Sequence, residues 1–180
     1  MIHEEILDYL QAALVTALID SVVTDDPARV GVVKLGPLQG DPDPDAARIS
    51  IELYENDPDN EVKGSGIGGM TWGWQDEVYE IECGGSITWI RRFTIKSRCL
   101  LESTGEELLA AKRIASTVRS RIERTLLGLS FSGVESEDEY VARGPFSEDI
   151  ASETVQAGGP PDAFDFNIKM RFTLLTTQKV

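Results

Sequence analysis

The sequence has few of the residues that catalysis and metal binding usually require. It contains one histidine, His3, and two cysteines, Cys83 and Cys99. A nucleophile activated by histidine would depend on that single side chain near the N-terminus, and two cysteines make neither a disulfide framework nor a zinc site. We therefore expect reduced thiols, no catalytic residues, no metal, no cofactor and no enzyme activity.

Long apolar runs and an excess of basic charge are also missing. No apolar run approaches the ~20 residues that a membrane span needs, and the first residues are acidic where a secretory signal is basic. We expect a cytosolic chain with no membrane partner. With 17 basic and 31 acidic residues, the net charge of −14 opposes binding to a nucleic-acid backbone, which excludes a typical DNA reader.

The charge that is present is distributed unevenly. Residues 1–90 hold 4 basic and 18 acidic residues, residues 91–124 hold 9 and 4, and residues 125–180 hold 4 and 9. A basic central block between acidic flanks suits identical subunits that meet head to tail, although a solvated helix of mixed charge gives the same pattern. The candidate inter-subunit basic patch is Arg113, Arg119, Arg121 and Arg124.

Two stretches resemble ligand-binding motifs but lack the context that the chemistry requires. Residues 64–69 match the glycine pattern of dinucleotide-binding loops, but no predicted strand precedes them and no helix follows. Four carboxylates in residues 41–52 stand at positions 1, 3, 5 and 12 of a calcium loop, but Ala46 occupies the place of the required glycine. Both stretches are more typical of solvated loops.

The hydrophobic pattern predicts helices and strands in a segregated order. Apolar residues at helical spacing predict an amphipathic helix over residues 2–19. Ser103 or Thr104, with a glutamate three residues on, predicts a capped helix over 104–127. Its buried stripe would be Leu108, Ala111, Ala115, Val118, Ile122 and Leu126. Strands are predicted over 30–35, 49–54, 78–83, 87–101, 139–142, 151–156 and 164–176.

This order predicts an α+β fold in a single domain over residues 1–180. We expect an antiparallel or mixed sheet packed on one face by the N-terminal helix and the long central helix. Residues 78–83 and 87–101 would form a long β-hairpin. Matching their apolar faces requires a three-residue loop, which pairs Ile81 with Trp89.

Residues 56–74 are too long and too rich in glycine, asparagine, aspartate and proline for an ordinary connection. They predict either disorder or a projecting functional loop. Its end carries Met70, Trp72 and Trp74. These side chains are of the type that anchors interfaces, and the alternative is that they complete the subunit core.

In the order and length of its elements, the chain resembles the tail terminator proteins of long-tailed bacteriophages. The resemblance covers nearly all 180 residues and is carried by three stretches: 38–43 leading into 48–54, the strand 87–101 running into the helix 104–127, and the closing strand 164–176. It implies a structural virion protein that forms a hexameric ring on the tail tube, ends tail elongation and joins the tail to the head–neck connector. The family has no catalytic residues to carry over.

The resemblance also implies the partners. They would be further copies of this chain, the tail tube protein, a neck or head-closure protein, and viral DNA that passes through an acidic channel without sequence-specific binding. Met70, Trp72 and Trp74 would contact the tube or the adjacent ring, and assembly would take place in the host cytoplasm. Two alternatives stay open: another neck protein, such as a head-closure or head–tail adaptor protein, and a small ligand-binding α+β domain, which would need a polar concave pocket.

Overall fold

The structure is a computed structural model that describes residues 2–36, 48–56, 79–81, 86–102, 107–131, 140–159 and 162–179. The described elements, in chain order, are the helix α1 (Ile2–Val15), a π-helical turn η1 (Thr16–Asp20), β1 (Val32–Leu35), β2 (Ile49–Glu55), β3 (Tyr79–Ile81), β4 (Ser86–Glu102), the helix α4 (Leu108–Leu127), β5 (Tyr140–Arg143), a 3₁₀ turn η2 (Ser147–Asp149), β6 (Ala151–Gly158) and β7 (Ala163–Lys179).

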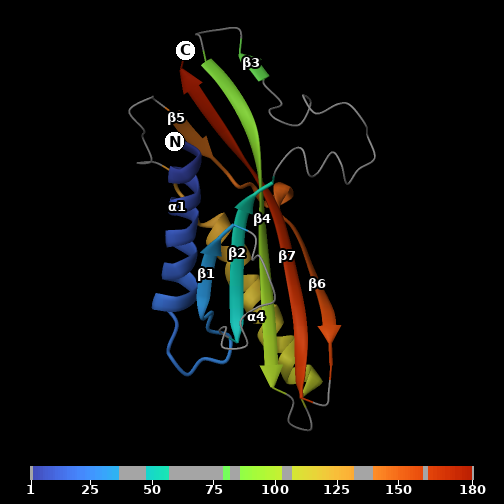
Figure 1. Ribbon diagram of the computed structural model, residues 1–180. Helices are drawn as coiled ribbons and strands as arrows, with labels where there is room; N and C mark the ends of the chain where they lie inside the picture. Colours follow the sequence, from blue (N-terminus) through green and yellow to red (C-terminus); the bar gives the residue numbers. More distant parts are fainter. Residues whose placement is uncertain are drawn as a thin grey trace.

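The described strands form one mixed sheet of α+β type. Its order is β1-β2-β4-β7-β5, with β3 added to β4 and β6 added to β7. Only β1 and β2 are parallel, and the other pairs are antiparallel. The two 17-residue strands β4 and β7 pair along their whole length and run through the centre of the molecule (Figure 1).

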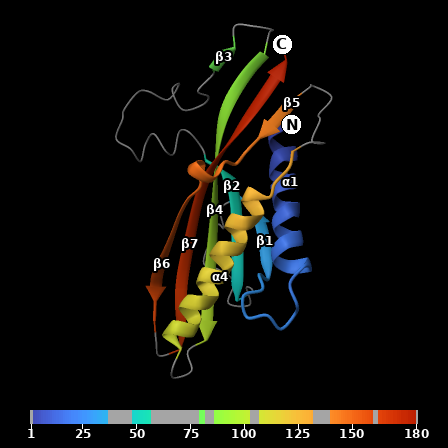
Figure 2. The ribbon, with the colours of Figure 1, turned by 180° about the vertical axis from the view of Figure 1, so that it is seen from behind.

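One face of this sheet carries the core because alternate residues of its central strands are apolar. The register places Leu53 opposite Ile95, and Phe93 opposite Phe172, so their side chains share that face. Both helices cover the same face, as predicted, with α4 lying across β4 and β7 and α1 beside β1 (Figure 2). The helices contribute Ile6, Leu10, Leu14, Leu18, Ala111, Ala115, Val118, Ile122 and Leu126 to the core.

The other face of the sheet is charged, and no described helix lies on it. A row of side chains crosses five strands in register, namely Lys34, Glu52, Lys96, Lys169 and Glu153. Opposite charges alternate except at the central lysine pair. Like charges directly opposite each other disfavour a strand pair. The apolar core on the helix side must therefore hold β4 against β7 at this point.

The predicted start of the long helix was wrong. The helix α4 begins at Leu108, its N-cap is Glu107, and no side-chain hydrogen bond caps it. Ser103 and Thr104 lie outside the described residues. Leu108 is 38% exposed and does not join the buried stripe. The reason is its position: α4 begins at the end of the sheet where β4 stops (Figure 2), so the first turn has little to pack on.

The predicted register of the β3–β4 hairpin was also wrong. The pairs are Tyr79 with Thr88, Glu80 with Ile87 and Ile81 with Ser86, which shifts β3 by three residues from the predicted alignment with Trp89. A strand of three residues contributes too few cross-strand pairs for apolar matching to set the register.

The one cysteine in the described residues, Cys99, is buried on the core face of β4. Burial raises the pKa of its thiol to about 11. We expect Cys99 to resist thiol reagents at pH 8 in the native state, because the reactive thiolate is scarce and enclosed. In the C83S variant, Ellman's reagent should label Cys99 at least tenfold faster in 6 M urea than in buffer. Immediate labelling in buffer would contradict the burial.

Candidate subunit interface

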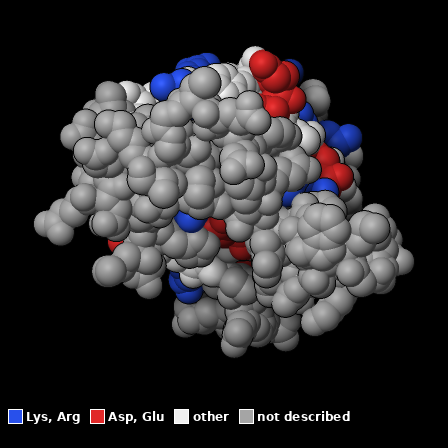
Figure 3. Space-filling model, turned by 90° about the horizontal axis from the view of Figure 1, so that it is seen from above, with Lys and Arg blue, Asp and Glu red and all other residues white. Residues whose placement is uncertain are grey.

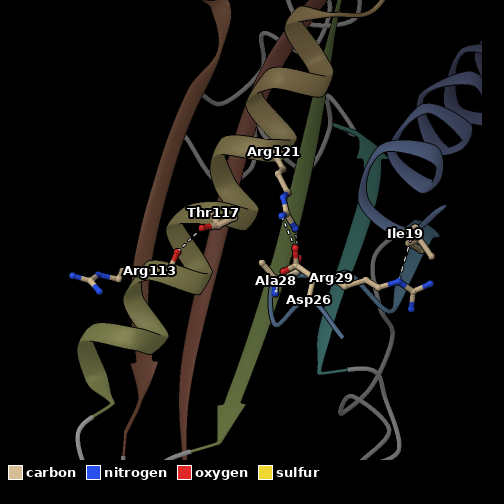
Figure 4. A network of polar contacts seen from close by, with 7 residues as sticks. All are labelled: Ile19, Asp26, Ala28, Arg29, Arg113, Thr117 and Arg121. Carbon is tan, nitrogen blue, oxygen red and sulfur yellow. Dashed lines mark hydrogen bonds and ion pairs between the residues drawn. The ribbon is translucent and has the colours of Figure 1, made fainter. Parts of the chain in front are cut away.

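The helix α4 is fixed to the rest of the subunit through Arg121. Its Nη2 lies 2.7 Å from Asp26 Oδ2, and its Nη1 donates to the carbonyl of Ala28 at 3.3 Å (Figure 4). The amide of Ala28 in turn donates to Asp26 Oδ1 at 2.8 Å. Arg121 and then the Ala28 amide hold the pKa of Asp26 below its usual range, because both bind the charged carboxylate. Arg121 therefore stabilises the fold of its own subunit and is not free to contact a neighbouring subunit.

This ion pair makes the stability depend on pH. The Asp26 pKa is lower in the folded than in the unfolded state, so the pair stabilises the fold above the ordinary carboxyl pKa of 3.8 and is lost as pH falls through the folded value. The D26N variant should lose about 0.5–1 kcal/mol of unfolding free energy at pH 7 and progressively less as the pH falls below 3.8. Urea titrations measure this. D25N, at an exposed neighbour, is the matched control and should lose nothing; an equal loss in D25N would contradict the pairing.

A second network joins α4 to the strand β6. Arg119 Nε lies 3.1 Å from Glu123 Oε1, one helical turn along. The hydroxyl of Ser152, on β6, donates to the same carboxylate oxygen at 2.6 Å. The Ser152 hydrogen bond and then Arg119 hold the pKa of Glu123 below its usual range. Glu123 therefore stays ionised at neutral pH and couples the helix to the strand.

The remaining two arginines of the predicted patch are available to a partner. Arg113 and Arg124 are exposed, and neither has an ion-pair partner among the described residues. The side chain of Arg113 points away from the Arg121 network (Figure 4). Lys112, which the predicted patch did not include, is also exposed. The position of Lys112 within the basic block of residues 91–124 could have placed it in the patch, but the direction of its side chain depends on the fold.

A groove of about 420 Å³ lies between α4 and β6. Its floor is formed by Ala115 and Phe166, and its walls by Lys112, Ser116, Arg119, Thr154 and Gln156. The lining holds two cations, two hydroxyls and an amide, with no carboxylate or imidazole that could act as a general base. Such a lining suits an acidic, extended segment that places apolar groups on the floor.

Carboxylates prevail at the opposite edge of the sheet. Asp8, Asp20 and Asp25 are exposed on α1, on η1 and just after it, and α1 lies beside the edge strand β1, on the far side of the sheet from β6 (Figure 1). Seen from above, blue and red side chains stand next to each other among the described residues (Figure 3). The end of the molecule that faces the viewer in Figure 3 therefore presents both signs of charge among its described residues.

Several predicted features lie outside the described residues. They are Met70, Trp72 and Trp74, the acidic turn at 41–45 and the glycine stretch 64–69. Within the described ranges, no group of His, Cys, Asp and Glu side chains could hold a metal ion. None of the described helices has the length and apolar character needed to cross a membrane.

Comparison with known proteins adds no relative to these observations. The chain matches no protein-family model, and no curated protein is significantly similar to it in sequence. The function is therefore inferred from the residues and their geometry.

Proposed function

We propose that this chain is a tail-terminator-type virion protein. It forms a ring, hexameric by resemblance, that caps the tail tube of a long-tailed phage, ends tail elongation and joins the tail to the neck. The observation that carries the proposal is the placement of charge at the two edges of one sheet. Lys112 and Arg119 of α4 line the groove beside β6, and the exposed carboxylates of Asp8, Asp20 and Asp25 lie on the α1 side. Closed rings require such heterologous contacts, in which one surface meets a different one.

The charges on the sheet restrict which surface could line the proposed acidic channel. The helix-free face of the sheet carries Lys34, Lys96 and Lys169 against Glu52 and Glu153 in its central row. Such a face attracts DNA phosphates rather than repelling them. We therefore place this face of the sheet away from the wall of an acidic channel. Six copies, each with a net charge of −14, would repel DNA from the wall and let it slide.

Native mass spectrometry with negative-stain imaging tests the ring. We expect a species of six times 19.8 kDa with a central hole, formed in solution or on tails assembled without the chain. Those tails should grow beyond normal length alone and stop at normal length when the protein is added. Tails whose length ignores the added protein would contradict the proposal. Protein labelled at the head side of the neck would instead favour a head-closure or adaptor role.

The groove between α4 and β6 favours one second candidate, the ligand-binding domain. Its volume of about 420 Å³ is large enough for a small anionic molecule. A thermal-shift screen of small carboxylates and phosphates tests this candidate. A rise of several degrees that the K112A variant abolishes would support it, and unchanged melting temperatures would leave the groove to a protein partner.

A further inference from the structure

The strand β6 is an unpartnered edge of the sheet. It pairs with β7 on one side, from Ala151 opposite Arg171 to Gln156 opposite Phe166. No described strand pairs with its other side (Figure 1). Six of its eight residues are exposed, and Val155 is 54% exposed. Backbone donors and acceptors along such an edge are available to another chain.

The strand at the opposite edge of the sheet, β1, is protected against pairing with another chain, whereas β6 is not. The edge strand β1 has four residues and an exposed lysine, and the amide of Gln11 on α1 donates to the Val33 carbonyl at 3.0 Å. The strand β6 has eight residues, no proline or lysine, and one charged residue, Glu153. Its bulge lies at the end, between Gln156 and Gly158, so the preceding residues stay regular. Soluble proteins normally blunt an edge of this kind, so its openness points to a partner.

The residues around β6 indicate which charge the partner would carry. The groove beside the strand carries Lys112 and Arg119 above an apolar floor. The Ser152–Glu123 hydrogen bond of 2.6 Å fixes the strand to α4, so the edge and groove form one rigid surface. An added strand would pair with the β6 backbone, cover Val155 and place acidic side chains near the groove cations.

We propose that the outer edge of β6, with the α4–β6 groove, is the docking site for an extended acidic segment of a second copy of this chain. The second copy is the occupant because the chain carries 31 acidic against 17 basic residues, and this excess of carboxylates complements the lysine and the arginine that line the groove. The proposal rests on the ring function proposed above and names the surface through which one subunit receives the next. The contact is heterologous, as closure of a ring requires.

The V155K variant tests this docking site. A lysine at the centre of the edge strand opposes strand addition. We expect it to weaken self-association at least tenfold by native mass spectrometry. L100K is the matched control, because Leu100 is also an exposed apolar residue, at 44%, and lies on β4, which pairs with strands on both sides. An oligomer that V155K leaves intact, or that L100K weakens equally, would overturn the proposal.

Hydrogen exchange separates this proposal from the ring function itself. In the wild-type oligomer, the amides of residues 151–156 that do not pair with β7 should exchange at least tenfold more slowly than in the dilute subunit, and those around Leu100 should not change. An oligomer that caps tails while these amides exchange at the subunit rate would overturn the β6 contact and leave the ring function standing. A chain that stays monomeric in solution and on tails would overturn both.

Discussion

Replacing Phe93 with alanine should cost about 3–5 kcal/mol of unfolding free energy, the largest loss expected from any single core change here. Phe93 is fully buried at the centre of β4. Its ring stacks on Phe172 of β7 at 5.4 Å between centroids, and the two residues are register partners. Deleting the ring leaves a cavity between the two longest strands, which the helices above cannot fill without repacking.

Urea unfolding followed by circular dichroism measures this loss. L109A is the control, because Leu109 is 59% exposed on α4 and its truncation should change stability by no more than about 0.5 kcal/mol. If F93A does not fold at all, F93L keeps most of the volume and should lose about 1–2 kcal/mol. An F93A loss below that of L109A would contradict the placement of the core between β4 and β7.

The parts of the fold that periodicity predicts are those with many repeats of the pattern. The buried residues of α1 recur every four positions, and β2, β4 and β7 alternate over long stretches, so each burial face could be read directly. The two wrong predictions concern places with almost no repeats. The β3 register depends on three pairs, and the start of α4 depends on where the sheet ends beneath it. The local hydrophobic pattern determines neither the register of β3 nor the start of α4.

For the candidate interface, only the composition could be predicted from the sequence. The basic block was visible in the sequence, and the spacing of Arg119 and Glu123 is that of a helical ion pair. The pairing of Arg121 with Asp26 joins residues 95 positions apart, so only the fold could show that this arginine is already engaged. Residues 151–156 were predicted as a strand. Their position at an open edge, beside a basic groove, follows from the sheet order alone.

The largest functional effect is expected from Trp72 and Trp74, if they anchor the ring to the tail. The double variant W72A/W74A should fold and melt like wild type but cap tails at least tenfold less efficiently. Aromatic side chains supply much of the binding energy at such contacts, and truncating one commonly costs about 2 kcal/mol or more. The assay mixes the purified variant with tails assembled without the chain and measures tail length by negative stain.

Two readouts keep this prediction decisive. Circular dichroism and urea unfolding report whether the subunit still folds, and F146A is the control for loss of an exposed aromatic, because Phe146 is 45% exposed next to η2. A W72A/W74A subunit that no longer folds would place the tryptophans in the core and contradict docking. A folded variant that caps tails normally would also contradict it. Only a folded subunit that fails to cap, beside a fully active F146A, assigns the two tryptophans to the tail contact.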